Sequence, residues 1–259
     1  TGVTVNGLPG GEPGLVAGTG ANSMKSADAL TPSNTADANG SLSVAIGGDT
    51  VAGSTGTALG FWAKSIGSSS VSIGAYSRAD GASSLCIGHN GAVQGGSGIG
   101  IGRLIAVTSE ATNGIAIGNT AKSRASNAIN IGFNSVIDDS IRVDTVTIGA
   151  NSKTAQYSTA LGAGSFAIGA NSVAISDSTA AANYAVSIGW NAAANSAEGV
   201  VALGYNVNAA PWANSTTVNQ IAFQNYAGLN FADDTAAATG GVPLGGVYHN
   251  AGALRIRIA

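Results

Sequence analysis

The feature that most limits how this chain can fold is a glycine that recurs about every 14 residues. Between residues 43 and 205 each of these glycines follows Ile or Leu, and further glycines lie near the middle of several intervals. Self-similarity at a fixed period is typical of repeat architectures, in which each unit packs on its neighbours. The repeat glycines are Gly47, Gly60, Gly74, Gly88, Gly102, Gly118, Gly132, Gly149, Gly162, Gly189 and Gly204.

Each repeat glycine ends a short segment in which residue types alternate. In Ser43-Val44-Ala45-Ile46-Gly47, two aliphatic residues flank a small one. Side chains alternate between the two faces of a β-strand, so this pattern predicts a short strand with its aliphatic residues on one face. The glycine then permits a turn with positive φ. The repeat therefore predicts an all-β stack of coils of about 14 residues, each holding two short strands and two turns.

The small position between the two aliphatic residues never holds anything larger than Asn. We interpret this face as packed against another copy of the chain, and we expect an oligomer because one thin roll buries only a narrow Ile/Val/Leu seam. Cys86 belongs to this series, so it is expected to be a packed residue and not a nucleophile. The series is Ala45, Ala58, Ser72, Cys86, Gly100, Ala116, Asn130, Thr147, Ala160, Ala174, Ser187 and Ala202.

The repeat divides the chain into three segments. Residues 1–40 hold three prolines among many small polar residues and are expected to be an irregular lead-in. Residues 41–208 form the roll. Residues 209–259 are expected to form a small β-rich cap or trimerisation segment, with one helical turn near 233–240 and a hairpin whose strands flank Asn250-Ala251-Gly252.

Composition argues against several classes of function. Charged residues make up only 9% of the chain and the net charge is −3, so no nucleic-acid partner is expected. The single cysteine and the separated His89 and His249 predict no metal site. No apolar run reaches the roughly 20 residues of a membrane span, so no membrane insertion is expected. Asp138 and Asp139 are interpreted as solvating a bulged loop.

The sequence also argues against an enzyme. The glycines of Gly98–Gly102 lack the βαβ context of a dinucleotide-binding loop. Ile-Gly repeats occur in left-handed β-helix acyltransferases, but those have a period of six residues and these gaps are near multiples of seven. We therefore predict no catalytic residues, no cofactor and no metal.

Two stretches resemble a known family. Asn171-Ser172-Val173-Ala174-Ile175-Ser176 and the preceding residues 164–172 are similar to the head repeats of YadA-like trimeric autotransporter adhesins. The resemblance implies a left-handed parallel β-roll, three copies of which pack around a common axis. It further implies that apolar residues fill each roll and that small residues line the packed faces.

The C-terminal residues 240–259 resemble the closing segment of tailed-phage fibre proteins. This resemblance implies a structural and adhesive fibre protein of a bacteriophage virion, such as a tail fibre that contributes to host attachment. Its partners would be itself, other virion proteins at one end, and a host cell-surface glycan or protein receptor. The alternatives are the head of a bacterial surface adhesin and a capsid decoration fibre with only a spacer role.

The residues just after the repeat glycines are the candidate receptor contacts. Repetition should place them in one column along an edge of the roll, where exposed aromatic rings can stack on sugars or anchor a protein receptor. Edge packing between subunits is the alternative role. The candidates are Phe61, Trp62, Tyr76, Phe133, Trp190 and Tyr205, and His89 and Arg103 share their place in the repeat.

Overall fold

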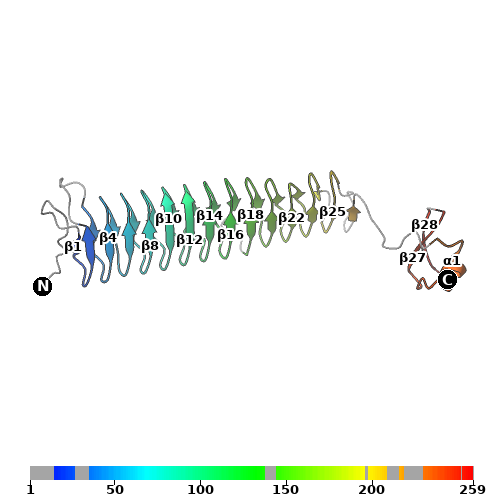
Figure 1. The fold of residues 1–259 in the computed structure, drawn as a ribbon, viewed down its shortest axis with the longest axis horizontal. Helices are drawn as coiled ribbons and strands as arrows, with labels where there is room; N and C mark the ends of the chain where they lie inside the picture. Colours follow the sequence, from blue (N-terminus) through cyan, green and yellow to red (C-terminus); the bar gives the residue numbers. More distant parts are fainter. Residues whose placement is uncertain are drawn as a thin grey trace. The chain divides into compact units, whose positions relative to one another are not determined.

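The computed structural model of the protein describes residues 15–26, 35–137, 144–195, 198–208, 216–218, 230–251 and 253–258. The chain divides into two units, Thr1–Val218 and Asn219–Ala259. The first unit is a parallel β-solenoid of about 11 coils, whose strands follow one another along its length (Figure 1). The second unit combines one short helix with a β-hairpin.

Sheet 1 of the solenoid contains the strands that precede the repeat glycines. Its strands are mostly three residues long, which is what a half-coil of about seven residues allows. They are, in spatial order, β1 (Leu15–Ala17), β2 (Met24–Ser26), β4 (Val44–Ile46), β6 (Thr57–Leu59), β8 (Val71–Ile73), β10 (Leu85–His89), β12 (Ile99–Arg103), β14 (Ile115–Ile117), β16 (Ile129–Ile131), β18 (Val146–Ile148), β20 (Thr159–Leu161), β22 (Val173–Ile175), β24 (Val186–Ile188), β25 (Val201–Leu203) and β26 (Thr216–Val218).

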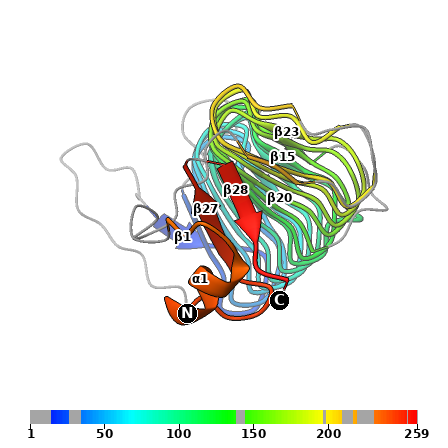
Figure 2. The ribbon, with the colours of Figure 1, turned by 90° about the vertical axis from the view of Figure 1, so that its right-hand side faces the viewer.

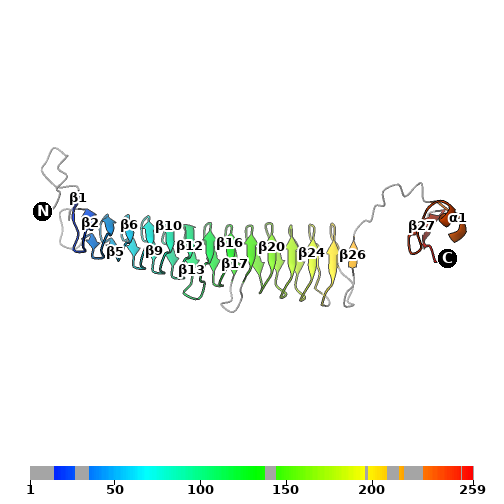
Figure 3. The same ribbon diagram turned by 90° about the horizontal axis from the view of Figure 1, so that it is seen from below.

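Sheet 2 contains the second strand of the coils between β2 and β24, where its strands alternate with those of sheet 1 along the sequence (Figure 3). Its strands are two residues long. They are β3 (Asp37–Ala38), β5 (Val51–Ala52), β7 (Lys64–Ser65), β9 (Arg78–Ala79), β11 (Ala92–Val93), β13 (Ala106–Val107), β15 (Lys122–Ser123), β17 (Val136–Ile137), β19 (Lys153–Thr154), β21 (Phe166–Ala167) and β23 (Thr179–Ala180).

The solenoid strands pair in parallel and keep the repeat in register, with Ala45 beside Ala58 and Cys86 beside Gly100. The exception is β1, which pairs with β2 in antiparallel orientation. The prediction that residues 1–40 are irregular is wrong for 15–26 and 37–38, because β1, β2 and β3 already belong to the two sheets. At the other end β26 extends sheet 1 beyond residue 208.

The interior of the roll lies between the two sheets (Figure 2). The small residues of sheet 1 point into this space: Ala45, Ala116 and Ala160 are fully buried, as is Cys86. The prediction that small residues face another copy while aliphatic residues fill the roll is therefore wrong, because the small residues fill the roll and the aliphatic residues face outward. Only residues 47–50 connect β4 to β5. Such short turns hold the sheets so close that little more than Ala, Ser, Thr or Cys fits between them.

Larger interior side chains of sheet 2 face the smallest residues of sheet 1. A Cβ atom on Gly100 would lie 2.6 Å from Cγ2 of Val93, so the glycine leaves the room that this valine occupies. Ile105, Val107 and Cys86 join the same buried cluster. The core is thus a series of small clusters along the roll. In each cluster, large and small side chains from the two sheets are complementary in size.

Buried serines satisfy the polar atoms of the turns. Ser43 Oγ donates to the carbonyl oxygen of Gly40 at 2.7 Å, and Ser70 Oγ bonds Gly67 in the same way at 2.7 Å. A buried carbonyl without a partner would cost about 1–3 kcal/mol. The serine three residues after a turn glycine therefore closes the turn from inside.

Each coil turns at two residues with positive φ after its sheet 1 strand. The repeat glycines have φ between +116° and +151°. The residue two positions later is also left-handed, and it is Asn in several coils, as at Asn134 and Asn151. Asn tolerates this region better than most residues, because its short side chain can hydrogen-bond locally. Here the Asn134 amide donates to Asn151 Oδ1 of the next coil at 2.9 Å.

The second unit contains the helix and hairpin that the sequence predicts. Helix α1 (Asp234–Thr239) begins after Asp233, whose carboxylate accepts the amide hydrogen of Ala236 at 2.8 Å. Strands β27 (Val247–Asn250) and β28 (Ala253–Ile256) pair in antiparallel orientation. Tyr248 packs with buried Ala237 and Val242 in a small core of its own. The role of this unit as a cap stays a prediction.

Candidate functional site

The outer face of sheet 1 carries two rows of aliphatic side chains. They are the residues on either side of the buried small position, and those nearer the repeat glycine stay partly exposed in the single chain. Ile46 and Ile101 are 36% exposed, and Ile148 is 40% exposed. A contiguous apolar surface of this length on a soluble monomer is typical of an interaction site.

The outer face of sheet 2 is more polar. The outward residues include Asp37, Lys64, Arg78, Lys122 and Lys153, and Arg78 pairs with Asp80 at 2.6 Å. The two outer faces of the roll therefore differ in chemistry: one is suited to apolar packing, and the other to solvent and polar ligands.

The edge at which sheet 1 passes to sheet 2, here called the glycine edge, holds the predicted contact residues. Phe61, Trp62 and Tyr76 form one cluster, and each is between 41% and 48% exposed. Trp62 stacks on Tyr76 at 6.3 Å between ring centroids, and Phe61 meets Tyr76 edge-on at 5.5 Å. His89 extends the cluster, 6.0 Å from Tyr76. The repeat therefore brings residues from three coils onto one surface.

A second group lies farther along the same edge. Trp190 and Tyr205 stack in adjacent coils at 5.2 Å with 17° between their planes, and they are 51% and 63% exposed. Phe133 is exposed in the same column, and no ring contact joins it to either group among the described residues. Arg103 ends β12 on this edge. The predicted contact residues thus lie on one edge of the roll, as two aromatic clusters and an isolated phenylalanine.

Two of these aromatic residues occupy a costly backbone conformation. Trp62 has φ +58° and Tyr76 has φ +57°, at the turn position where Asn90, Asn134 and Asn191 stand in other coils. The left-handed region costs a residue with a bulky side chain about 1–2 kcal/mol. The same turn position is left-handed in other coils too, for example at Leu104 and Thr120, so the conformation belongs to the repeat. What sets Trp62 and Tyr76 apart is that their large rings are exposed and add little to the core of the roll.

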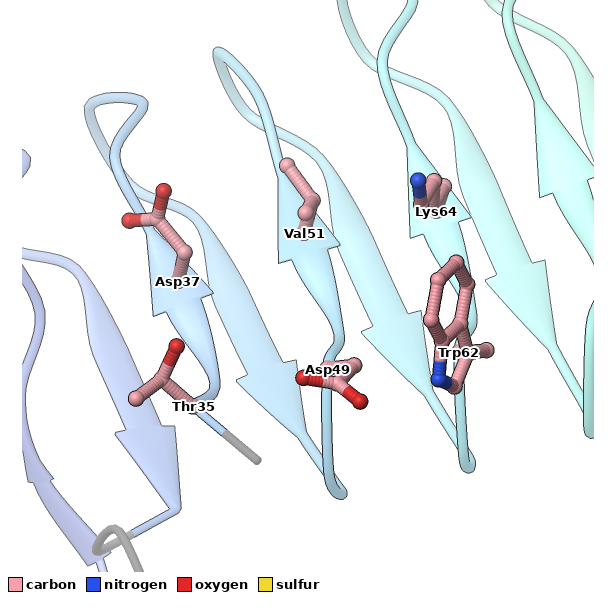
Figure 4. Close-up of a pocket in the computed structure, with 6 residues that line it drawn as sticks. All are labelled: Thr35, Asp37, Asp49, Val51, Trp62 and Lys64. Atoms are coloured by element: carbon pink, nitrogen blue, oxygen red, sulfur yellow. The ribbon is translucent and has the colours of Figure 1, made fainter. Parts of the chain in front are cut away.

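A hollow adjoins the first aromatic cluster on the outer face of sheet 2 (Figure 4). Three successive coils each contribute one turn residue and one strand residue, two positions apart, so that both side chains point outward. The hollow has a volume of about 260 Å³. Its lining residues are Thr35, Asp37, Asp49, Val51, Trp62 and Lys64.

Two charged groups of the hollow, Asp37 and Lys64, lie on opposite sides of Val51, and Asp49 lies two residues before Val51 in the same coil. Asp37 and Asp49 come from the two earlier coils, and Lys64 comes from the third. The Nζ atom of Lys64 lies 5.0 Å from the centre of the Trp62 ring. Asp37 accepts a hydrogen bond from the Asn39 amide at 3.3 Å. Within the described residues no ion pair joins Lys64 to either carboxylate.

Sequence reasoning missed the polar members of the hollow and two exposed tyrosines. Tyr157 and Tyr184 lie on the opposite edge of the roll, where sheet 2 returns to sheet 1, and they are 49% and 58% exposed. Their positions midway between repeat glycines could have identified them. Lys64 could have been found from its place two residues after Trp62, because residues two apart share a face of a strand.

The remaining candidate groups are Cys86, His249 and the pair Asp138 and Asp139. Burial raises the pKa of the Cys86 thiol, which agrees with the packed role predicted for it. Over the described ranges no group of three or more His, Cys, Asp or Glu could hold a metal ion, and no helix is long and apolar enough to cross a membrane. His249 lies in β27. Asp138 and Asp139 lie outside the described residues.

Comparison with known proteins agrees with the geometry. Residues 154–175 match the family description of the YadA head domain repeat, in two copies. No curated protein matches the chain. The matched residues cover β20, β21 and β22 almost completely, and the flanking coils repeat the same two-strand unit. The solenoid thus contains YadA-like head repeats.

Proposed function

We propose that this chain is a non-enzymatic, homotrimeric adhesive fibre protein that bacteriophage virions use for host attachment. The observation that carries the proposal is the aliphatic outer face of sheet 1. The interior of the roll is already filled by small residues, so Ile46, Ile101 and Ile148 can be buried only by another molecule. Full burial of such a side chain is worth about 1.5–3 kcal/mol, and the rows extend over the whole solenoid.

The resemblance to YadA-like heads supports three copies around a common axis. Packing through sheet 1 leaves the outer face of sheet 2 and its charged residues in solvent, where Lys122 and Lys153 are exposed. Attachment to the host is assigned to the glycine edge, with Phe61, Trp62, Tyr76, Phe133, Trp190 and Tyr205 as the receptor contacts. Other virion proteins would hold one end of the fibre.

Two measurements test the proposal. Sedimentation equilibrium of the purified chain should give three times its mass of 25.0 kDa. Fluorescently labelled protein should adsorb to cells of at least one strain in a panel of bacteria, and the Trp190→Ala/Tyr205→Ala double variant should adsorb at least fivefold less. Tyr184→Ala on the opposite edge is the matched control. A monomer would contradict the fibre, and equal adsorption of the double variant would favour a spacer role.

A bacterial surface adhesin head is the second candidate, because the matched repeat is itself the head repeat of that family. The two differ in what carries the fibre. Immunogold electron microscopy with an antibody against the chain distinguishes them. Label on the tails of virions supports the phage fibre, whereas label on the outer surface of bacterial cells free of virions supports the adhesin.

A further inference from the structure

We infer that the hollow formed by Asp37, Asp49, Val51, Trp62 and Lys64 binds one ring of a neutral saccharide. The inference rests on the proposed function, and it adds the class of ligand and the place on the fibre where that ligand binds. The hollow lies on the outer face of sheet 2, opposite the aliphatic face, so trimer packing through sheet 1 leaves it open. Its volume of about 260 Å³ is below the range of about 300–1,000 Å³ usual for drug-sized ligands, so it suits a single ring.

The polar groups of the hollow require a ligand that both donates and accepts hydrogen bonds. The carboxylates of Asp37 and Asp49 only accept, and the ammonium group of Lys64 only donates. Sugar hydroxyls do both, so adjacent hydroxyls of one ring can bond groups on either side of the hollow. The Thr35 hydroxyl at the rim adds a group of either kind.

The charges disfavour other ligand classes. An anion would approach two carboxylates, which are half-buried and so less screened by water than exposed ones. A cation would meet the ammonium group of Lys64, which lies 5.0 Å from the centre of the Trp62 ring. A neutral ligand avoids both conflicts.

Trp62 supplies the apolar contact that a sugar ring needs. One face of a pyranose presents only C–H bonds, which pack against the electron-rich face of an indole. Tyr76 of the following coil stacks on Trp62 and holds its plane, while the hollow lies towards the preceding coils. Val51 forms the apolar floor between the charged residues.

Asn is the most informative replacement for Trp62 in a test of ligand binding. Asn occupies the same turn position in other coils, for example at Asn90 and Asn134, so Trp62→Asn is expected to fold. Binding is measured on the full chain by saturation-transfer difference NMR with free glucose, galactose, mannose and N-acetylglucosamine, after a screen on an array of neutral and acidic oligosaccharides. Heparin and choline serve as the anionic and cationic probes.

We expect at least one neutral sugar to bind, at least tenfold more weakly to Trp62→Asn and at least fivefold more weakly to Asp49→Asn, with Tyr184→Ala unchanged. Binding of heparin or choline that Trp62→Asn abolishes would overturn the inference, as would the absence of any neutral sugar whose binding depends on Trp62. Cell adsorption separates this outcome from the proposed function. If Trp62→Asn and Asp49→Asn still adsorb to cells and no sugar binding is found, the saccharide site is contradicted and the fibre proposal stands. If a sugar binds but the chain is a monomer that adsorbs to no cell, the fibre proposal is contradicted and the saccharide site stands.

Discussion

Gly60 stacks against Gly74 of the next coil so closely that a Cβ atom on Gly60 would lie 2.8 Å from the carbonyl carbon and oxygen of Gly74. The φ of Gly60 is +127°, a region that residues with a Cβ rarely adopt. Both conditions hold because the coils are in register, so one turn lies on the next. The repeat glycines are therefore required by the stacking of coils as well as by the turn itself.

Gly60→Ala should destabilise the solenoid by about 2 kcal/mol or more, since the methyl group meets backbone that cannot move without breaking the register. Thermal unfolding followed by circular dichroism measures the effect. Gly96→Ala is the matched control, because the nearest atom to its added Cβ lies 4.0 Å away and its φ is not in the left-handed region. Equal melting temperatures for the two variants would contradict the stacking argument.

Ala160→Leu should destabilise the roll by about 1–3 kcal/mol, because the side chain at this position is fully buried between two sheets that lie too close for Leu. Urea unfolding of the variant gives the change in the free energy of unfolding. Ala163→Leu places the same side chain on an exposed turn residue, and little change is expected there. A stable Ala160→Leu protein would mean that the roll has unfilled space.

Ile148→Asp should convert the proposed trimer into monomers. This side chain is 40% exposed on the aliphatic face, and burying an unpaired carboxylate between subunits costs several kcal/mol. Analytical ultracentrifugation reads the mass. Ala106→Asp, which adds the same charge at an outward position of sheet 2, should leave the trimer intact. If Ala106→Asp dissociates the assembly and Ile148→Asp does not, the subunits associate through sheet 2.

Tyr184→Asn should stabilise the solenoid by about 1 kcal/mol. Its φ is +56° on the opposite edge, and Asn bears the left-handed region at lower cost than Tyr. Tyr184→Ala removes the ring but keeps a Cβ without a local hydrogen bond, so it should show no comparable gain. Differential scanning calorimetry compares the three proteins. A lower melting temperature for Tyr184→Asn would show that the ring packs in the assembled fibre.

The second unit should lose stability in alkaline solution. The Tyr248 hydroxyl donates to Asp234 Oδ1 at 2.6 Å, and this hydrogen bond, with burial, raises the pKa of Tyr248 above its ordinary value of 10.0. The folded unit then holds this proton to a higher pH than the unfolded chain does. The stabilisation is complete below pH 10 and is lost as pH rises through the folded-state pKa. Calorimetry of the full chain between pH 8 and 11 should show the loss, and Tyr248→Phe should flatten it.

Much of the fold could be predicted from the sequence, because the period of about 14 residues and the alternation around Ala45 and Ala160 directly express the coil and its strands. The helix after Asp233 and the turn at Asn250-Ala251-Gly252 were also readable from local signals. The early strands β1 to β3 were not, since their segments lack the repeat glycine and contain or adjoin prolines. The aromatic edge followed from the repeat, but the hollow did not, because Asp37, Asp49 and Lys64 carry no motif.

The sequence by itself determined that Val44 and Ile46 share one face of a strand and that Ala45 has the other. However, the alternation of aliphatic and small residues along the strand does not indicate which of its two faces lies inside the roll. Only the tertiary structure decided this, because the short turns bring two sheets so close that the small residues must fill the space between them. The aliphatic residues are thereby left on the outer face. The same stacking of coils brings together residues 12 or more positions apart, such as Asp37, Asp49 and Trp62, whose meeting no local pattern contains.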